Sequence, residues 1–158
     1  MSVLVCNTSP LILLAKVGLL PLLPQLFDRI LVPGAVIAEI QAGPDGDPMA
    51  AALPNERWLE RVDVIPGLSP LARWQLGAGE AEVIEYARVN GNLPVAIDDR
   101  AGRRAAVALG LRLYGTLSIV AVAAKQGRIP SFDSAVAQLR LRGLYVSEQV
   151  VDDVRRSL

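Results

Sequence analysis

Histidine is absent from the 158 residues of this chain, and that absence removes whole classes of chemistry. Without an imidazole the protein has no Ser-His-Asp triad, no histidine general base and no histidine-ligated zinc site. The single cysteine, Cys6, lies in an apolar run and has no partner for an internal disulfide. Its setting favours a small buried hydrophobic side chain over a nucleophile.

Aromatic residues are also scarce, at 4% of the chain, although 52% of the residues are hydrophobic. Leucine, valine, alanine and isoleucine must therefore build the core, as suits helices packed on a sheet. The length is most simply that of one domain, residues 1–158, and is sufficient for a proper hydrophobic core.

Neither sign of charge is in excess, because 16 basic residues balance 16 acidic ones. This balance argues against a protein that binds nucleic acid by bulk charge alone, but it permits a local basic rim. Lysine is rare, with only Lys16 and Lys125, so arginine supplies the other 14 cations. Arginine suits bidentate phosphate contacts better than lysine does, although a GC-rich coding bias would produce the same excess.

No apolar run is long enough to span a bilayer, which needs about 20 residues. The best candidate, from Leu11 to Leu26, is interrupted by Lys16, Pro21 and Pro24. No basic stretch precedes the first apolar segment, so a secretory signal peptide is not expected either. These absences predict a cytoplasmic protein without membrane contact, and a reducing compartment suits the lone cysteine.

Apolar patterns that suit strands and helices alternate along almost the whole chain. Expected strands cover 2–6, 29–32, 62–65, 93–98 and 111–114. Expected helices cover 11–18, 19–27, 33–42, 49–60, 77–90, 100–110, 117–126, 131–142 and 147–156. Residues 69–76 suit a linker or short helix, and 43–48 a solvated loop without the ligand spacing of a calcium site. The alternation predicts a three-layer α/β/α fold around a mostly parallel sheet.

Acidic or amide side chains recur where the expected strands end or helices begin. The strand 93–97 runs directly into Asp98 and Asp99, and Asn7 follows the first strand. Because strand ends and helix starts share one edge of a parallel sheet, these groups can converge in one cleft. The remaining members of the set are Glu39, Glu80 and Glu82.

An all-oxygen ligand set favours a hard cation, Mg²⁺ or Mn²⁺. Such sites support phosphodiester hydrolysis, in which metal polarises the phosphoryl oxygen and activates a water. Arg100, Arg103 and Arg104 come next in the chain and can meet a phosphate backbone at the rim.

Structural roles are open for the same residues. Asp99 suits an N-cap of the helix that follows it. Glu80 and Glu82 suit first-turn acids that the helix dipole favours. Arg103 and Arg104 suit ordinary surface cations. Spacing alone does not decide between these roles and a metal site.

Several segments taken together resemble the PIN-domain superfamily of metal-dependent ribonucleases, and more narrowly its DUF3368 branch. Each segment alone is weak, but their order and spacing hold over almost the whole chain. They are Asn7-Thr8-Ser9-Pro10-Leu11-Ile12, Val32-Pro33-Gly34-Ala35-Val36-Ile37-Ala38-Glu39-Ile40, Gly79-Glu80-Ala81-Glu82-Val83-Ile84, Ile97-Asp98-Asp99-Arg100-Ala101-Gly102-Arg103, Tyr114-Gly115-Thr116-Leu117 and Ala124-Lys125-Gln126-Gly127-Arg128-Ile129-Pro130.

The resemblance implies an endoribonuclease that acts as the toxin of a toxin–antitoxin pair. It implies Mg²⁺ or Mn²⁺ as cofactor, RNA as substrate and a small cognate antitoxin protein as partner. A homodimer is expected as well, with the apolar helices between Leu11 and Phe27 as its candidate surface.

The same resemblance assigns a metal and catalytic role to particular residues. The set comprises Asn7 as a metal ligand only, with Glu39, Glu80, Asp98 and Asp99. Within the acidic pair, Asp99 is the better match to the family pattern because Arg103 follows four residues later, whereas Asp98 has the better strand-end position. Auxiliary roles as ligand helpers or in orienting a ligand or water fall to Ser9, Glu82 and Thr116.

Asn7 departs from the family pattern, in which active ribonucleases mostly have aspartate at this position. An amide offers one neutral oxygen and a weaker electrostatic pull on a cation. This departure leaves open a PIN-like module that binds nucleic acid or protein without catalysis. It also disfavours phosphoryl transfer through an aspartyl intermediate, which needs an aspartate at the end of the first strand.

Overall fold

The computed structural model describes residues 2–65 and 75–158. The strands are β1 (Val3–Cys6), β2 (Arg29–Pro33), β3 (Leu59–Val62), β4 (Val95–Ala96) and β5 (Leu113–Tyr114). The helices are α1 (Thr8–Lys16), α2 (Leu22–Leu26), α3 (Gly34–Gln41), α4 (Pro48–Ala52), α5 (Ala78–Val89), α6 (Arg100–Ala108), α7 (Thr116–Lys125), α8 (Phe132–Leu141) and α9 (Glu148–Arg156).

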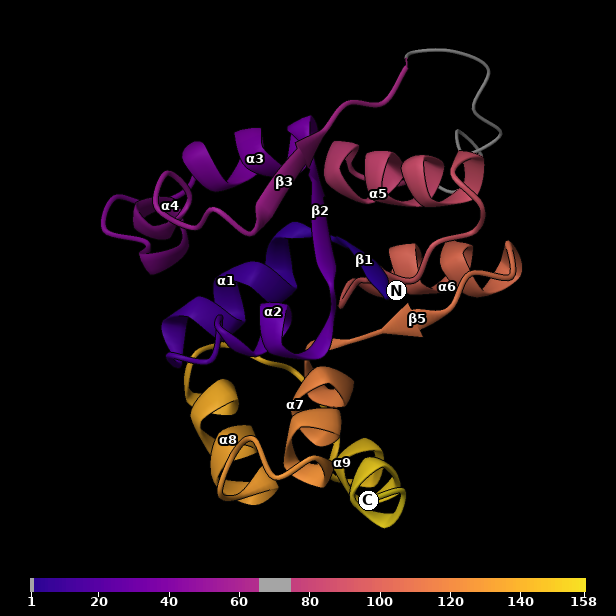
Figure 1. The fold of residues 1–158 in the computed structure, drawn as a ribbon. Helices are drawn as coiled ribbons and strands as arrows, with labels where there is room; N and C mark the ends of the chain where they lie inside the picture. Colours follow the sequence, from indigo (N-terminus) through magenta and orange to yellow (C-terminus); the bar gives the residue numbers. More distant parts are fainter. Residues whose placement is uncertain (1, 66–74) are drawn as a thin grey trace.

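The strands form one parallel five-stranded sheet in the order β3-β2-β1-β4-β5 (Figure 1). Val5 of β1 is paired with Leu31 of β2 on one side and with Val95 of β4 on the other. Helices cover the sheet, which confirms the expected three-layer α/β/α architecture. The strand order reverses between β1 and β4, so their carboxyl ends flank the topological switch point of the sheet.

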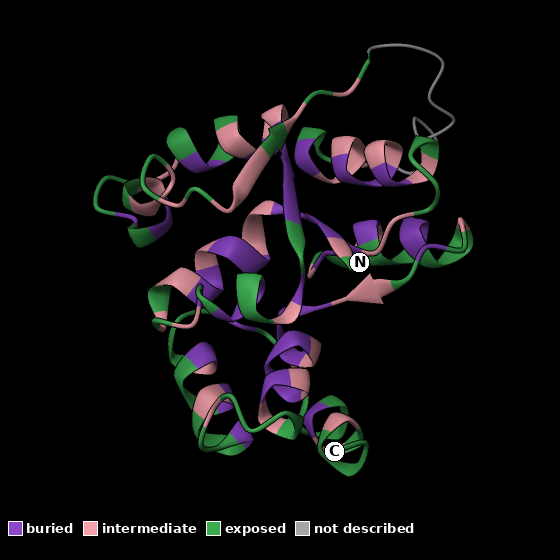
Figure 2. Cartoon of the chain, viewed as in Figure 1, coloured by how far each residue is buried: buried purple, intermediate pink, exposed green. Residues whose placement is uncertain are grey.

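Aliphatic side chains fill the space between the layers, as the composition predicts. Leu4, Val5 and Ile97 on the central strands are fully buried, as are Leu11 on α1 and Ile84 on α5. Figure 2 shows the buried residues along the sheet and on the helix faces that turn toward it. Figure 1 shows α3 beside α5 and a separate group formed by α7, α8 and α9.

The prediction of one helix from 49 to 60 is wrong. Helix α4 ends at Ala52, and Leu59 and Glu60 belong to strand β3. Pro54 follows directly after the C-cap Leu53, and a proline has no N–H with which to continue a helical ladder. The edge strand that was predicted at 62–65 therefore lies at Leu59–Val62 instead.

The remaining boundaries shift by a few residues. The first helix begins at Thr8 rather than residue 11, and the second covers only Leu22–Leu26. The regular part of β4 is Val95–Ala96, although the Pro94 carbonyl and the Ile97 N–H also bond to neighbouring strands. The linker or short helix expected at 69–76 falls largely outside the described residues.

The apolar side chains of α1 and α2 pack into the core of the molecule. Leu11, Leu14 and Leu23 are fully buried, and Phe27 is nearly so. Little of the segment between Leu11 and Phe27 is left as an apolar outer face for a dimer. Within the described ranges 2–65 and 75–158, none of the helices has the length and apolar character needed to cross a bilayer.

Candidate functional site

Asp98 lies at the carboxyl edge of the sheet, just beyond β4, and is fixed there by three hydrogen bonds. The backbone N–H of Thr116 donates to its Oδ1 at 2.8 Å. The hydroxyls of Thr116 and Ser9 donate to its Oδ2 at 2.6 Å and 3.2 Å. Because Thr116 opens α7, the carboxylate also benefits from the positive end of that helix dipole. These donors compensate the negative charge of Asp98.

Asp99 has a different role from its neighbour. Its side chain accepts a hydrogen bond from the backbone N–H of Gly102 at 3.1 Å and forms the N-cap of α6. The side chain is exposed, whereas Asp98 is partly buried. Asp99 thus has the capping role that the sequence left open. Asp98 instead lies at the carboxyl end of the central strands.

Asn7 is the N-cap residue of α1, yet its side chain caps nothing. Its Nδ2 donates to Oε1 of Glu80 at 3.3 Å, and its Oδ1 is buried without any hydrogen-bond partner. Only 2% of the residue is exposed. An orphaned buried acceptor costs about 1–3 kcal/mol, and asparagine normally avoids this cost at a helix start by capping.

The other carboxylates of the set come from α3 and α5, and two of them bridge these helices. Glu39 of α3 accepts hydrogen bonds from the Thr8 hydroxyl and, at 3.0 Å, from the Gly79 N–H in the first turn of α5. In return, Glu82 of α5 accepts from the Ala35 N–H in the first turn of α3 at 2.9 Å. Glu82 therefore holds the start of α3, and Glu39 lies beside the amide of Asn7.

Two glycines mark where backbone passes close to these side chains. A β-carbon on Gly79 would lie 2.7 Å from Oε2 of Glu39 and 3.0 Å from Oδ1 of Asn7. A β-carbon on Gly102 would lie 2.8 Å from Cγ2 of Ile97 and 3.1 Å from Cγ of Glu80. Any larger residue at these positions would displace the carboxylates, so the glycines are part of the arrangement.

The cluster is strongly negative, because none of Glu39, Glu80, Asp98 and Asp99 has an arginine or lysine partner among the ion pairs of the described residues. Arg103 of α6 does not pair with Asp98, and its guanidinium donates to the Ile97 carbonyl at 3.0 Å. Arg100 and Arg104 are exposed on the same helix.

Cys6 lies beneath the cluster and is inert. It is fully buried, and both burial and the nearby charge of Asp98 raise the pKa of its thiol far above the ordinary range. The side chain is therefore a protonated core residue, which agrees with the expectation from the sequence.

The donor set suits a hard divalent cation. In the part of the chain that the structure describes, no three carboxylates or thiols already converge as a finished ligand set. The orphaned Oδ1 of Asn7, with Glu39 and Glu80 at its sides, nevertheless provides an oxygen that needs a positive partner. All candidate ligands are oxygens, as Mg²⁺ and Mn²⁺ prefer.

Sequence reasoning did not identify Thr8, whose hydroxyl binds Glu39. Asparagine, threonine and serine all cap helices well, so a run of them before a helix is readily explained by capping alone. The signal was that three consecutive polar residues follow a buried strand, which is more than one cap requires. Ser9 and Thr116, in contrast, were expected near the cluster and do bind Asp98.

Comparison with known proteins gives two findings. The family model described as "DUF3368: PIN domain" matches residues 3–158. A solved structure of a PilT N-terminus domain protein from the hyperthermophilic archaeon Sulfolobus solfataricus P2 is similar, with a TM-score of 0.53 and 15% sequence identity. The alignment covers 77% of this chain and 92% of that one, and at this identity it supports the fold alone. No curated protein matches the chain.

Proposed function

The chain belongs to the DUF3368 family of PIN domains, and from this premise we propose that it is a divalent-metal-dependent endoribonuclease. PIN domains are in general metal-dependent nucleases. In the proposed site the metal ligands are Asn7, Glu39, Glu80 and Asp98. Asp99 stays outside it because its side chain is committed to capping α6.

One observation supports this proposal above the others. The Oδ1 atom of Asn7 is buried, lacks a donor and lies between Glu39 and Glu80. A role in fold stability alone would use that oxygen as a helix cap, as the chain does with Asp47, Asp99, Ser131 and Ser147. An oxygen held unpaired among carboxylates is instead suited to a cation.

The protein side chains would hold the metal and keep its ligands in one orientation. When bound, Mg²⁺ or Mn²⁺ would supply a Lewis acid that polarises the phosphoryl oxygen and lowers the pKa of a water. Thr116 and Ser9 hold the Asp98 carboxylate in one orientation through their hydrogen bonds. Thr8 does the same for Glu39. Carboxylates that are fixed in this way are more effective than flexible ones, because no side chain has to reorient during the reaction.

Cleavage of labelled RNA by the purified protein with Mg²⁺, Mn²⁺ or EDTA tests the activity. We expect cleavage that depends on the metal and falls at least 100-fold in Asp98→Asn and Glu80→Gln, by analogy with the loss of one electrostatic partner at other sites. Asp63→Asn is the matched control, because this exposed aspartate after β3 pairs with Arg61 and is not one of the proposed ligands. Equal rates for wild type and both site variants would refute the assignment.

A second candidate function is a PIN-like module that binds nucleic acid or protein without catalysis. The neutral amide of Asn7 favours it, since the family position is mostly occupied by aspartate. Titration calorimetry with Mn²⁺ separates the two functions. A binding module without a metal site gives no heat of Mn²⁺ binding, whereas the nuclease gives heat that Asp98→Asn removes.

The biological role that fits this activity is the toxin of a toxin–antitoxin pair in the cytoplasm, with a small cognate antitoxin as partner. Expression of the chain alone should then arrest growth, and expression of the antitoxin should restore it. A homodimer also belongs to this proposal, although the segment from Leu11 to Phe27 offers it little apolar surface. Light scattering of the purified protein measures the oligomeric state.

A further inference from the structure

A pocket of about 960 Å³ opens beside the acidic cluster, between α6, the start of α7 and the C-terminal helix α9. Asp98 lines one end of it, with Arg100, Arg103 and Arg104. The opposite wall contains Tyr145, Val150 and Val154. The proposed site and this pocket are therefore continuous, which makes the pocket a path toward Asp98.

The basic end of the pocket differs from the other arginine-rich part of the chain. Arg140, Arg155 and Arg156 of α8 and α9 are all engaged with carboxylates. No ion pair of the described residues involves Arg100 or Arg104, and both side chains are exposed. These guanidiniums are therefore available for an anionic ligand such as a phosphate.

Tyr145 is the aromatic residue of the pocket, and it is almost completely exposed, at 97%. It belongs to the loop between α8 and α9, and among the described residues its side chain has neither a hydrogen bond nor a ring contact. A ring left in water contributes no hydrophobic free energy to folding, whereas most large apolar side chains are covered. An exposed aromatic ring and unpaired arginines that line one pocket are the kind of groups with which proteins bind single-stranded nucleic acid.

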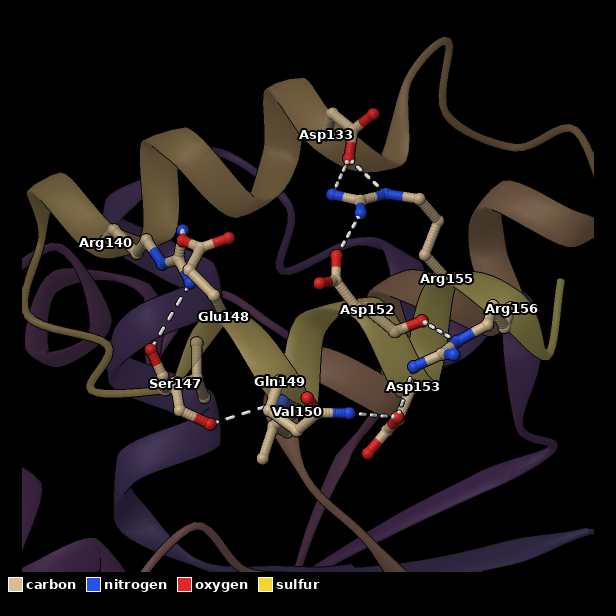
Figure 3. Close-up of polar contacts among 11 residues, drawn as sticks. Asp133, Arg140, Ser147, Glu148, Gln149, Val150, Asp152, Asp153, Arg155 and Arg156 are labelled. Atoms are coloured by element: carbon tan, nitrogen blue, oxygen red, sulfur yellow. Dashed lines mark hydrogen bonds and ion pairs between the residues drawn. The ribbon is translucent and has the colours of Figure 1, made fainter.

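The wall that carries Tyr145 is held firmly by α9. Figure 3 shows the two ion pairs that join this helix to α8: Arg155 of α9 binds Asp133, and Arg140 of α8 binds Glu148. Arg155 also binds Asp152 within α9 itself. Ser147 caps the helix by accepting from the Val150 N–H. On another side of α9, Val151 is buried in the core. Val150 and Val154 are thereby left to face the pocket.

We propose that this pocket binds the unpaired RNA strand next to the scissile phosphate, with Tyr145 stacking on one base and Arg100 and Arg104 binding the backbone. The proposal rests on the ribonuclease function above and adds the side chains outside the metal site that would hold the strand. A base in a duplex has both faces covered by its neighbours, so it has no free face for Tyr145. Single-stranded or looped RNA is the form that fits.

Binding of a fluorescently labelled single-stranded oligoribonucleotide tests the inference. The oligonucleotide carries 2′-O-methyl groups, which prevent cleavage, and anisotropy is measured in EDTA. We expect Tyr145→Ala to weaken binding about 5-fold to 150-fold, as loss of one base stack does, and Tyr145→Phe to bind within about twofold of wild type. Arg104→Ala should reduce the slope of log K against log salt by about 0.7, as for one lost phosphate contact on a single strand.

Two controls match these variants. Leu141 is an exposed apolar residue at 78%, and Arg57 is an exposed arginine, and neither lines the pocket. Leu141→Ala and Arg57→Ala should bind the strand like wild type. The inference is overturned if Tyr145→Ala binds the single strand as tightly as wild type, or if a duplex of the same sequence binds as tightly and equally depends on Tyr145.

A leucine-rich acidic peptide is the second probe, because a protein segment could also combine apolar and negative groups. Its tight binding, without any binding of the oligoribonucleotide, would overturn the inference in favour of a protein partner. The proposed function fails separately. Tyr145-dependent binding without metal-stimulated cleavage would refute the nuclease but leave the strand-binding pocket, whereas cleavage that is indifferent to Tyr145 would refute only the pocket.

Discussion

At the scale of single residues, the neutral amide of Asn7 limits the charge repulsion within the acidic cluster. Its Nδ2 donates to Glu80, and its Oδ1 lies close to Glu39. An aspartate here would lose the donor and place a buried negative charge next to the carboxylates of Glu39 and Glu80. We therefore expect Asn7→Asp to lower the free energy of unfolding in EDTA by about 1–3 kcal/mol. Urea denaturation measures it.

The same variant should respond more strongly to metal than wild type does, because a carboxylate attracts a cation more than an amide does. Adding Mn²⁺ should recover the stability that Asn7→Asp loses in EDTA. Asn7→Ala is the control, since it removes the donor without adding charge and should recover nothing. Equal stability of Asn7→Asp and wild type in EDTA would contradict this account of the cluster.

Gly79 offers a second prediction at this scale. The added methyl of Gly79→Ala would lie 2.7 Å and 2.8 Å from the two carboxylate oxygens of Glu39, so that side chain must move. We expect a loss of Mn²⁺ affinity of about 10-fold or more, in line with disturbed support of metal ligands elsewhere. The fold should persist, because alanine is the better helix former. Gly34→Ala, which meets only the flexible ends of Arg61 and Asp63, should leave the calorimetric titration unchanged.

The buried thiol of Cys6 gives a pH dependence with a definite sign. Burial raises its pKa in the folded protein, whereas the unfolded chain releases the proton near pH 8.5. The folded state then binds one more proton, so its stability is complete below about pH 8.5 and falls above it by about 1.4 kcal/mol per pH unit. Denaturation curves at several alkaline pH values should show this slope for wild type relative to Cys6→Ala. Parallel pH profiles for the two proteins would contradict it.

At the scale of elements, the junction between β4 and α6 separates the duties of the two adjacent aspartates. Asp99→Ala should destabilise α6 by about 1 kcal/mol, the usual cost of a lost N-cap, whereas Asp99→Asn should be nearly neutral because asparagine caps equally well. Asp98→Asn should weaken Mn²⁺ binding, and Asp99→Asn should not. Calorimetry and urea denaturation on both aspartate-to-asparagine variants compare the two positions directly, and a larger metal effect at Asp99 would reverse the assignment.

The junction also shows what sequence reasoning can and cannot predict about elements. Residue types and apolar spacing alone predicted helices that start at 131 and 147, where Ser131 and Ser147 are the N-caps, and they predicted the extent of α5. The helix predicted at 49–60 failed, because Pro54 and the pairing of Leu59 with Ile30 of β2 outweigh the local helical pattern. Pairing partners lie far away in sequence, so no local pattern contains them.

The candidate site, too, could be predicted only in part from the sequence. Residue types and strand ends were sufficient to bring Asn7 and Asp98 to one edge of the sheet, and the family resemblance added Ser9 and Thr116. They could not show that Glu82 holds the start of α3, because that bond joins residues 47 positions apart. The choice between Asp98 and Asp99 likewise depends on a backbone direction at the end of β4, which composition does not encode.

At the scale of the whole molecule, the ligands of the proposed site come from the junction of β1 and α1, from α3 and α5, and from the end of β4, so a cation would join most of the fold. A bound metal stabilises only the folded state, by about 2.7 kcal/mol at 100 times the dissociation constant. For a chain of this length, that corresponds to a rise of roughly 5–10 °C in Tm. Thermal unfolding with Mn²⁺ should show the rise for wild type and lose it in Asp98→Asn. An unchanged Tm for wild type at saturating Mn²⁺ would count against a metal site.

The central position of β1 also has a consequence for synthesis. Ser9 and Asp98 must meet to form the site, yet they lie 89 residues apart in the chain. At about 5–20 residues per second, the ribosome needs roughly 4–18 s to make that span. During this interval the first strand exists without β4 beside it, and the nascent chain has no Asp98. The proposed site is therefore incomplete while the first half of the chain emerges beside the RNA of the ribosome, and it can form only after Asp98 and Thr116 have been made.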